Sequence, residues 1–445
     1  MHQQGPGPAT ASPSPLSFVQ AVASVATQAA HLLQDPPAAQ EVHPLAGAVG
    51  RVLAAPILAD RDQPPFDRAT RDGYAVRAED VARQQPLRVL GLLRAGEMWP
   101  AHRPALAAGE CIEIMTGAPL PHGANAVLMV EHAEQVPSAD GEFVRSAAGH
   151  ALQAGDNVVP RGSEARRGNL LVAPGTRLGV PQIALAAGCG LDRLPVYAQP
   201  RVAILATGDE LVEPGIETPE IAPCQIYNSN SHSTAVLVQQ AGAIPLRLPI
   251  ARDQHRDLAD GIRTGLETDL LLLTGGVSMG KYDLVEDVLA SLGAEFFFTS
   301  VRIQPGKPLV FGRVPASSSH AARYFFGLPG NPLSTMVTFA LFVRPLLAAL
   351  AGEAGWQPPF ALARLTTDLH HAPGLTRFLP AWLETAPLPA SPSDAPGPID
   401  GPSVTPVPWH GSGDLAANVR ANCYLVAPED QPHLSAGSYV RILLR

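Results

Sequence analysis

Three glycine-containing loops hold the residues of this chain that are best suited to bind a charged ligand. They occupy residues 207–210 (TGDE), 274–283 (TGGVSMGKYD) and 327–334 (GLPGNPLS). Glycine lets backbone N–H groups approach phosphate oxygens closely, and the starts of helices favour anions. Ser278 and Ser334 add hydroxyl donors. One such loop is more often a plain turn, but three together predict an anion site, although none has P-loop or GxGxxG spacing.

The chain has only two lysines, and both lie in glycine-containing loops. Lys281 belongs to the second loop, and Lys307 lies in a further one at 304–308 (QPGKP). A general bias towards arginine is one explanation. Arginine and lysine differ in shape and donor geometry, however, so their shared placement favours a local role for a compact ammonium group.

Carboxylates accompany the same loops. Glu210 and Asp283 lie within them, and Asp253 follows another predicted strand. A loop carboxylate is usually only solvated, but beside a phosphate site it would repel the ligand unless a cation lay between them. Since Mg²⁺ is bound by one or two carboxylates together with substrate phosphates, we expect Mg²⁺ here.

The loops need a scaffold that brings them together, and the central third of the chain predicts one. Apolar runs alternate there with helical patterns, which predicts a parallel sheet with helices on both faces. Ligands of such sheets bind at the carboxyl ends of the strands, so the three loops should face one crevice. The predicted strands are 201–206, 243–248, 269–273, 295–301 and 324–327, and the predicted helices are 229–241, 254–266, 283–292 and 331–350.

The flanks of the chain predict β-rich domains. Short apolar segments with many Gly and Pro residues lie at 49–58, 87–93, 110–115, 126–131 and 142–145, and further runs at 361–365, 378–383, 423–427 and 439–444 indicate a small β-barrel or sandwich. The predicted division is a disordered tail (1–15), an elongated N-terminal subdomain (16–55 and 150–199), a β-rich subdomain (56–149), a central α/β domain (200–352) and a C-terminal β-barrel domain (353–445).

Composition narrows the class of protein. A formal net charge of −9 argues against a general nucleic-acid binder. The four cysteines form no CxxC pair, and the histidines show no HxxxH or HExxH spacing. We therefore expect neither zinc sites nor disulfides, and we expect reduced thiols in the cytoplasm. Residues 16–34 predict a helix with a polar face rather than a membrane span, and residues 1–15 do not resemble a signal peptide.

Two further clusters lie far upstream of the loops. Residues 64–76 (PPFDRATRDGYAV) include Asp72, and residues 115–119 (MTGAP) include Thr116. Taken alone, each favours a surface turn. Neither forms a Ser/His/Asp or Cys/His arrangement.

Taken in order, these segments resemble the molybdopterin molybdenumtransferase family, which comprises MoeA-like proteins and the E domain of gephyrin. The resemblance covers about 16–445. It rests on the segments PPFDRATRDGYAVR, IMTGAPLPHGANAV, TGDELVEPG, IYNSNS, LLLTGGVSMGKYD, QPGKPLVFG, GLPGNPLSTMVTF and GSGDLAANVRANCYLV.

The resemblance implies transfer of molybdate onto the dithiolene sulfurs of adenylated molybdopterin, with release of AMP. It implies an elongated homodimer whose cleft lies between the α/β domain and the β-rich region of the partner. By motif, the site positions it implies are Asp72, Thr116, Glu210, Asp253, Asp283, Pro329 and Pro332, with Ser412 as a weaker candidate.

Physical reasoning adds roles to these positions. Gly208, Gly275, Gly276, Ser278 and Ser334, with Lys281 and Lys307, are expected to bind substrate, and Glu210 and Asp283 are expected to hold Mg²⁺. No activated protein nucleophile is needed, because the substrates supply sulfur and oxyanion. Protein partners left open are the preceding molybdopterin adenylyltransferase and acceptor molybdoenzymes.

The chain departs from the family where basic residues are usual. Before the PGKP segment, where relatives carry several basic residues, this chain has Ser300 and Gln304 on either side of Arg302. In a second stretch, Val159 occupies the position of a basic residue, and Glu164 that of an aspartate. These changes concern oxyanion binding rather than the fold. Two other functions remain open: a molybdopterin adenylyltransferase, against which the segments around Asp72 and Ser412 argue, and a scaffold that binds a partner peptide.

Overall fold

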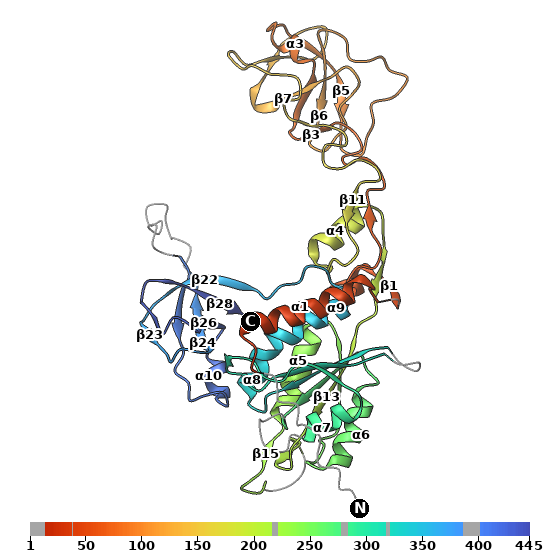
Figure 1. Ribbon diagram of the computed structural model, residues 1–445. Helices are drawn as coiled ribbons and strands as arrows, with labels where there is room; N and C mark the ends of the chain where they lie inside the picture. Colours follow the sequence, from red (N-terminus) through yellow and green to blue (C-terminus); the bar gives the residue numbers. More distant parts are fainter. Residues whose placement is uncertain (1–13, 38, 216–220, 277–283, 317–320, 386–400) are drawn as a thin grey trace, which may run out of the picture.

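The computed structural model describes residues 14–37, 39–215, 221–276, 284–316, 321–385 and 401–445. The first 13 residues of the predicted tail lie outside these ranges. The chain forms an elongated molecule in which a β-rich part stands away from a larger body, and the C-terminal barrel lies beside that body (Figure 1).

A six-stranded sheet forms the centre of the body. Its order is β16-β13-β17-β21-β20-β18. The first four strands are parallel, as predicted, whereas β20 runs antiparallel to both of its neighbours, β21 and β18. The reversal of β20 follows from its short connections to β18 and β21, since a parallel crossover needs roughly a dozen residues or more. The strands are β13 (Arg201–Ala206), β16 (Ile244–Arg247), β17 (Leu270–Thr274), β18 (Glu295–Phe298), β20 (Val310–Val314) and β21 (Arg323–Leu328).

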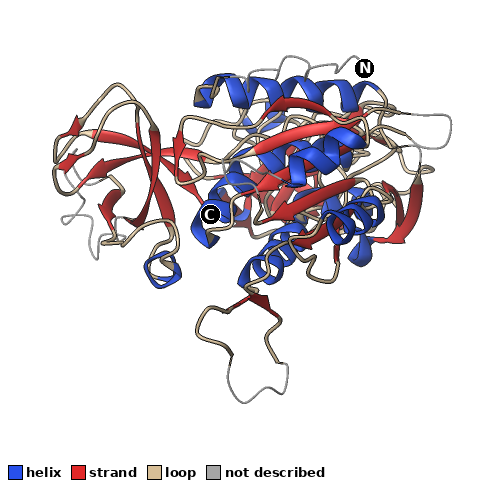
Figure 2. Cartoon of the chain, turned by 60° about the horizontal axis from the view of Figure 1, so that its bottom comes forward, coloured by secondary structure: helices blue, strands red, loops and turns tan. Residues whose placement is uncertain are grey.

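Helices cover both faces of this sheet (Figure 2). Successive side chains of a strand point to opposite faces, so Ile204 packs in one core and Leu205 in the other. The first core includes α1 (Phe18–Gln34), α5 (Ser229–Gln240), α8 (Pro332–Thr338) and α9 (Arg344–Leu350), and the second includes α6 (His255–Gly265) and α7 (Leu284–Ser291).

The helix predicted at 331–350 is present as α8, a π-helical turn at Phe339–Val343 and α9. By length and apolar character alone, Pro332–Leu350 is long enough to cross a membrane. Its most apolar stretch is 72% buried inside the molecule, however. It is therefore accounted for as a core helix of the α/β domain.

Two antiparallel strand pairs lead from the body to the β-rich part: β1 (Gln40–Pro44) with β12 (Arg193–Tyr197), and β2 (Ile57–Leu58) with β11 (Leu170–Val172). The strand predicted over 49–58 is thus limited to β2, since Pro56 interrupts it. The short helices α2 (Leu45–Ala48) and α4 (Val180–Gly188) pack against these two strand pairs.

The β-rich part holds a six-stranded sheet of order β7-β4-β6-β5-β9-β8. Its elements are β3 (Arg68–Ala69), β4 (Gly73–Val76), α3 (Ala78–Val81), β5 (Leu87–Leu93), β6 (Glu110–Ile114), β7 (Ala126–Met129), the 3₁₀ turn Val130–His132, β8 (Ala133–Val136), β9 (Phe143–Ser146) and β10 (Val158–Val159).

The C-terminal domain is a closed five-stranded barrel, which confirms one of the two predicted forms. The ring runs β22-β25-β24-β26-β28 and returns to β22. The strand β19 (Ile303–Gln304) leaves the α/β domain to pair with β24, so the two domains share a sheet. The elements are β22 (Phe360–Leu365), β23 (Leu369–His370), β24 (Thr376–Glu384), β25 (Ser403–Pro406), α10 (Leu415–Val419), β26 (Cys423–Ala427), β27 (His433–Leu434) and β28 (Tyr439–Leu444).

Candidate active site

The carboxyl ends of β13, β17 and β21 meet, and their loops pack directly on each other. A Cβ atom on Gly275 would lie 2.5 Å from the carbonyl oxygen of Thr207 and one on Gly330 would lie 3.7 Å from the Cα of Gly275. Gly275 also has a φ of +88°, which side chains rarely adopt. Glycine is therefore required at 275 both by its conformation and by the approach of the neighbouring strand.

Gly275→Ala should cost more stability than the same change at Gly293. Both glycines have positive φ, +88° and +80°, but a Cβ on Gly293 meets nothing within 4 Å. We expect Gly293→Ala to cost about 1 kcal/mol for the backbone conformation alone. Gly275→Ala should cost about 1–3 kcal/mol more, because one loop must move. Thermal unfolding of both variants measures the difference, and equal losses would show that the close packing is unimportant.

A cavity of about 580 Å³ opens over these strand ends. It brings together seven of the predicted site residues: Glu210, Gly275, Gly276, Lys307, Pro329, Ser334 and Ser412. A second compartment of about 410 Å³ adjoins it and adds Pro332. The two compartments share Glu210, Ile226 and the two loops at Gly275 and Gly330–Asn331. Ile226 belongs to β15 (Ile226–Tyr227), which pairs with β14 (Leu211–Val212).

Lys307 supplies the cavity with an exposed cation. Its ammonium group forms no ion pair with any described carboxylate. Its backbone is held firmly, because its carbonyl accepts hydrogen bonds from the amide of Val301 at 3.0 Å and from the hydroxyl of Ser300 at 3.2 Å. Ser300, one of the departures from the family pattern, is thus a buried support for the Lys307 loop.

Carboxylates gather after β13, where Glu210 lines the cavity but Asp209 and the predicted site residues Gly208 and Asp253 line neither compartment. The Glu210 side chain turns back over Gly208, where a Cβ would lie 2.6 Å from Oε2 of Glu210. The amide of Asp253 donates to Oδ1 of Asp209 at 3.4 Å. Burial raises the pKa of Asp253, and the charges of Asp209 and Glu210 raise it further. Negative charge gathered in this way suits a bound cation, although no three metal-binding side chains cluster within the described ranges.

Three predicted site residues, Ser278, Lys281 and Asp283, lie outside the described residues. Gly276 is the last described residue before them. Their expected roles therefore stay predictions.

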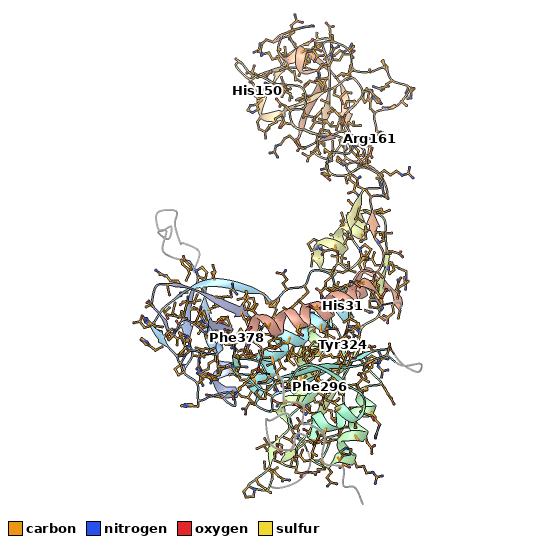
Figure 3. The ribbon with its side chains drawn as sticks, viewed as in Figure 1. His31, His150, Arg161, Phe296, Tyr324 and Phe378 are labelled. Atoms are coloured by element: carbon orange, nitrogen blue, oxygen red, sulfur yellow. The ribbon has the colours of Figure 1, made fainter. Side chains whose placement is uncertain are left out.

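Asp72 and Thr116 lie on the β-rich part, away from the cavity. Both the amide and the hydroxyl of Thr116 donate to Oδ1 of Asp72, at 2.6 and 2.8 Å. These two bonds lower the pKa of the Asp72 carboxyl. His150 and Arg161 mark this part of the molecule in Figure 3, well separated from Phe296 and Tyr324 of the central domain. A single chain thus does not bring Asp72 and Thr116 to the other site residues.

Sequence reasoning gave no role to several polar residues of the cavity. Asn331 donates from Nδ2 to the hydroxyl oxygen of Ser412 at 2.7 Å, and Asn230 donates to the carbonyl of Gly330 at 2.6 Å. Asn331 is the N-cap of α8 and Asn230 lies in the first turn of α5, and a polar residue at a helix start after a strand is the signal that would have found them. Gln304 also lines the cavity, and its buried Oε1 has no hydrogen-bond partner among the described residues.

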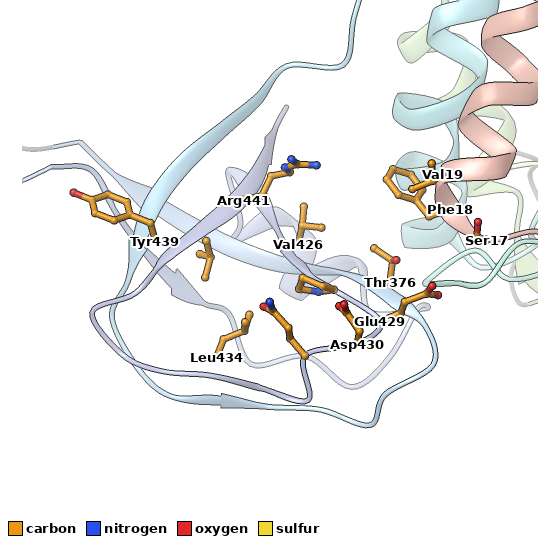
Figure 4. A pocket seen from close by; sticks show the side chains of 13 residues that line it. Ser17, Phe18, Val19, Thr376, Val426, Glu429, Asp430, Leu434, Tyr439 and Arg441 are labelled. Atoms are coloured by element: carbon orange, nitrogen blue, oxygen red, sulfur yellow. The ribbon is translucent and has the colours of Figure 1, made fainter.

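A separate groove of about 390 Å³ lies between the start of α1 and the barrel (Figure 4). Phe18, Leu434 and Tyr439 supply apolar surface, while Glu429, Asp430 and Arg441 supply charge. None of the predicted site residues lines it.

Comparison with known proteins accounts for the whole described fold. Three family models match: the MoeA N-terminal region (domain I and II) at 16–190, the "probable molybdopterin binding domain" at 203–349, and the MoeA C-terminal region (domain IV) at 362–444. Fold and site therefore define a multi-domain transferase of molybdenum-cofactor biosynthesis. The chain belongs to the MoeA family of molybdopterin molybdenumtransferases.

Individual relatives span most of the chain. The molybdopterin molybdenumtransferase of Nostoc sp. is 37% identical over 74% of this chain and 74% of its own. That of Haemophilus influenzae is 31% identical over 89% and 91%. The crystal structure of the molybdopterin biosynthesis moeA protein from Pyrococcus horikosii covers 97% of this chain and 99% of its own, with 31% identity and a TM-score of 0.68.

Proposed function

We propose that this protein inserts molybdate into adenylated molybdopterin, with release of AMP, in the cytoplasm. The observation that carries the proposal is the cavity itself. Its lining includes Lys307, whose ammonium forms no ion pair with a described residue, together with the glycine loop at Gly275–Gly276 and the Glu210 carboxylate. Anionic substrate groups and a carboxylate can share such a cavity when a cation lies between them.

Binding in this cavity depends on donors that the chain holds in place. The amide of Gly276 and the hydroxyl of Ser334 are suited to phosphate oxygens, and Lys307 adds a positive charge. The amide of Gly275 donates instead to the carbonyl of Leu328, at 3.4 Å. Pro329 and Pro332 stiffen the loop between β21 and α8. Because the substrates supply the reacting sulfur and oxyanion, the protein contributes mainly positioning and electrostatics.

Glu210, with Asp283, would hold Mg²⁺. The raised pKa of Asp253 fits this assignment, because it reflects carboxylates packed close to one another, with Asp209 and Glu210 both adding negative charge. When bound, Mg²⁺ offsets negative charge on the phosphoanhydride as that bond breaks. Asp209 and Asp253 would then add negative potential around the ion without contacting it.

The complete site would lie across a homodimer. Asp72 and Thr116 are fixed to each other on the β-rich part. That part stands away from the α/β domain, whose strand ends form the cavity (Figure 1). In the proposed dimer, Asp72 of the partner subunit faces the cavity. The two hydrogen bonds from Thr116 lower the pKa of this carboxyl.

An AMP-release assay tests the proposed function. Wild-type protein given adenylated molybdopterin should release AMP only when both molybdate and Mg²⁺ are present, and chelation of the metal should stop the reaction. Lys307→Ala should lower the rate at least about tenfold, since it removes a cation from the cavity lining. The Lys307 side chain is exposed, so the change should leave the melting temperature unchanged.

Two results would contradict the proposal. Consumption of ATP with bare molybdopterin would indicate an adenylyltransferase. Full restoration of cofactor synthesis in cells by Glu210→Ala, together with no binding of molybdopterin nucleotide, would indicate a scaffold.

A further inference from the structure

The hydroxyl of Ser412 is held in one orientation by a residue from another domain. Ser412 lies in the loop before α10, in the C-terminal barrel domain, while Asn331 begins α8 of the α/β domain. Nδ2 of Asn331 donates to Oγ of Ser412 at 2.7 Å, and the amide of Leu333 donates to the Ser412 carbonyl at 3.1 Å. These two bonds fasten the loop to the start of the helix.

The direction of the first bond decides what Ser412 offers to a ligand. A serine hydroxyl has one proton to donate. Since Oγ accepts from Asn331, that proton stays free, and Ser412 lines the same cavity as Lys307. Lys307 also can only donate. Molybdate and phosphate at neutral pH accept hydrogen bonds, so this end of the cavity suits them.

We propose that Asn331 is a positioning residue which fixes Ser412 as a hydrogen-bond donor to an oxyanion in the cavity. The inference rests on the proposed function for its substrates. The oxyanion is either molybdate or a phosphate group of adenylated molybdopterin. Measuring the KM for each of these two substrates shows which of them Ser412 binds.

Asn331→Asp reverses the bond without changing the shape of the side chain. A carboxylate only accepts, so the Ser412 proton turns towards residue 331 and away from the ligand. Aspartate begins a helix as well as asparagine does, so the melting temperature should not fall. We expect the KM of one oxyanion substrate to rise about tenfold, while the KM of the other and kcat change less than about twofold.

A double-mutant cycle separates orientation from plain charge repulsion. In a Ser412→Ala background there is no hydroxyl to turn and only charge repulsion remains, so Asn331→Asp should raise that KM by clearly less than tenfold. If the tenfold effect persists in this background, or if Asn331→Asp alone changes neither KM, the inference is overturned. Equilibrium dialysis with sodium molybdate and with inorganic phosphate measures the dissociation constant of each anion, so the same variants can be compared without the reaction. If wild-type protein releases no AMP, the proposed function fails while the dialysis still decides the role of Asn331.

Discussion

Two inactive variants of this chain should restore each other's activity when their subunits are mixed. Asp72→Ala removes a carboxylate from the β-rich part, and Glu210→Ala removes one from the cavity. In a mixed dimer with a shared site, one cavity carries both changes and the other carries neither. Refolding an equal mixture should therefore recover about a quarter of wild-type AMP release, since about half of the dimers are mixed and half of their sites are intact.

The geometry of the single chain motivates this expectation. Asp72 is preorganised by two hydrogen bonds from Thr116, at 2.6 and 2.8 Å. Such an arrangement has no evident target on its own chain, because the cavity is lined by other segments. A carboxylate that is ordered and kept ionised, yet distant from the site its motif implies, is explained if it completes the partner's cavity.

A second mixture provides the control. Glu210→Ala and Lys307→Ala both alter the same cavity. Each site of a mixed dimer then carries one change, so activity should stay at the level of the parent variants. Recovery in both mixtures would indicate simple averaging of weak activities, and recovery in neither would show that Asp72 does not complete the partner's cavity.

The arrangement of the site could be predicted from sequence where it depends on alternation along the chain. Apolar runs ending at Thr207 and Thr274, separated by helical patterns, were enough to predict neighbouring parallel strands with their loops on one edge. The structure pairs Ala206 with Thr274, which puts the two loops side by side. A buried strand and its following glycine are local signals, so a single sequence carries them.

Features that depend on distant packing could not be predicted. The strand β20 contains Gly312, which is typical of a turn, yet a Cβ there would collide with the ring of Phe325. The glycine is needed because two strands approach closely. The bond between Asn331 and Ser412 joins residues 81 positions apart in different domains, and no periodicity records such a pair.

Glu353→Ala should be among the most destabilising single changes in the described part of the chain. The Glu353 carboxylate is buried and accepts from Nη2 of Arg177 at 2.6 Å, and Nη1 of Arg344 lies 3.5 Å from the same oxygen. Its loss leaves two partly buried guanidinium groups near each other. Removing one partner of a buried ion pair costs about 3–5 kcal/mol, so the melting temperature should fall by on the order of 10 °C.

Glu295→Ala is a matched control at an exposed ion pair. Glu295 accepts from Arg313 at 2.7 Å, but the glutamate side chain is 51% exposed, compared with 10% for Glu353. An exposed pair contributes about 0–1 kcal/mol, so this variant should unfold within a few degrees of wild type. Similar losses in both variants would show that burial does not matter here.

The Glu353 cluster also ties the domains together. Arg177 belongs to the arm, the region of the strand pairs β1–β12 and β2–β11 that leads to the β-rich part. Nη1 of Arg177 donates to the carbonyl of Gly50 at 2.6 Å. Arg344 begins α9 and stacks on Trp356, with 4.9 Å between its guanidinium carbon and the ring centre. Burial and the charge of Arg177 lower the pKa of Arg344, whereas Glu353 raises it.

Without Glu353 the two arginines repel each other, so the arm should loosen from α9 before the α/β sheet unfolds. In the Glu353→Ala variant, hydrogen exchange should therefore speed up, relative to wild type, more at the amides of Gly50 and Leu178 than at the amide of Leu272.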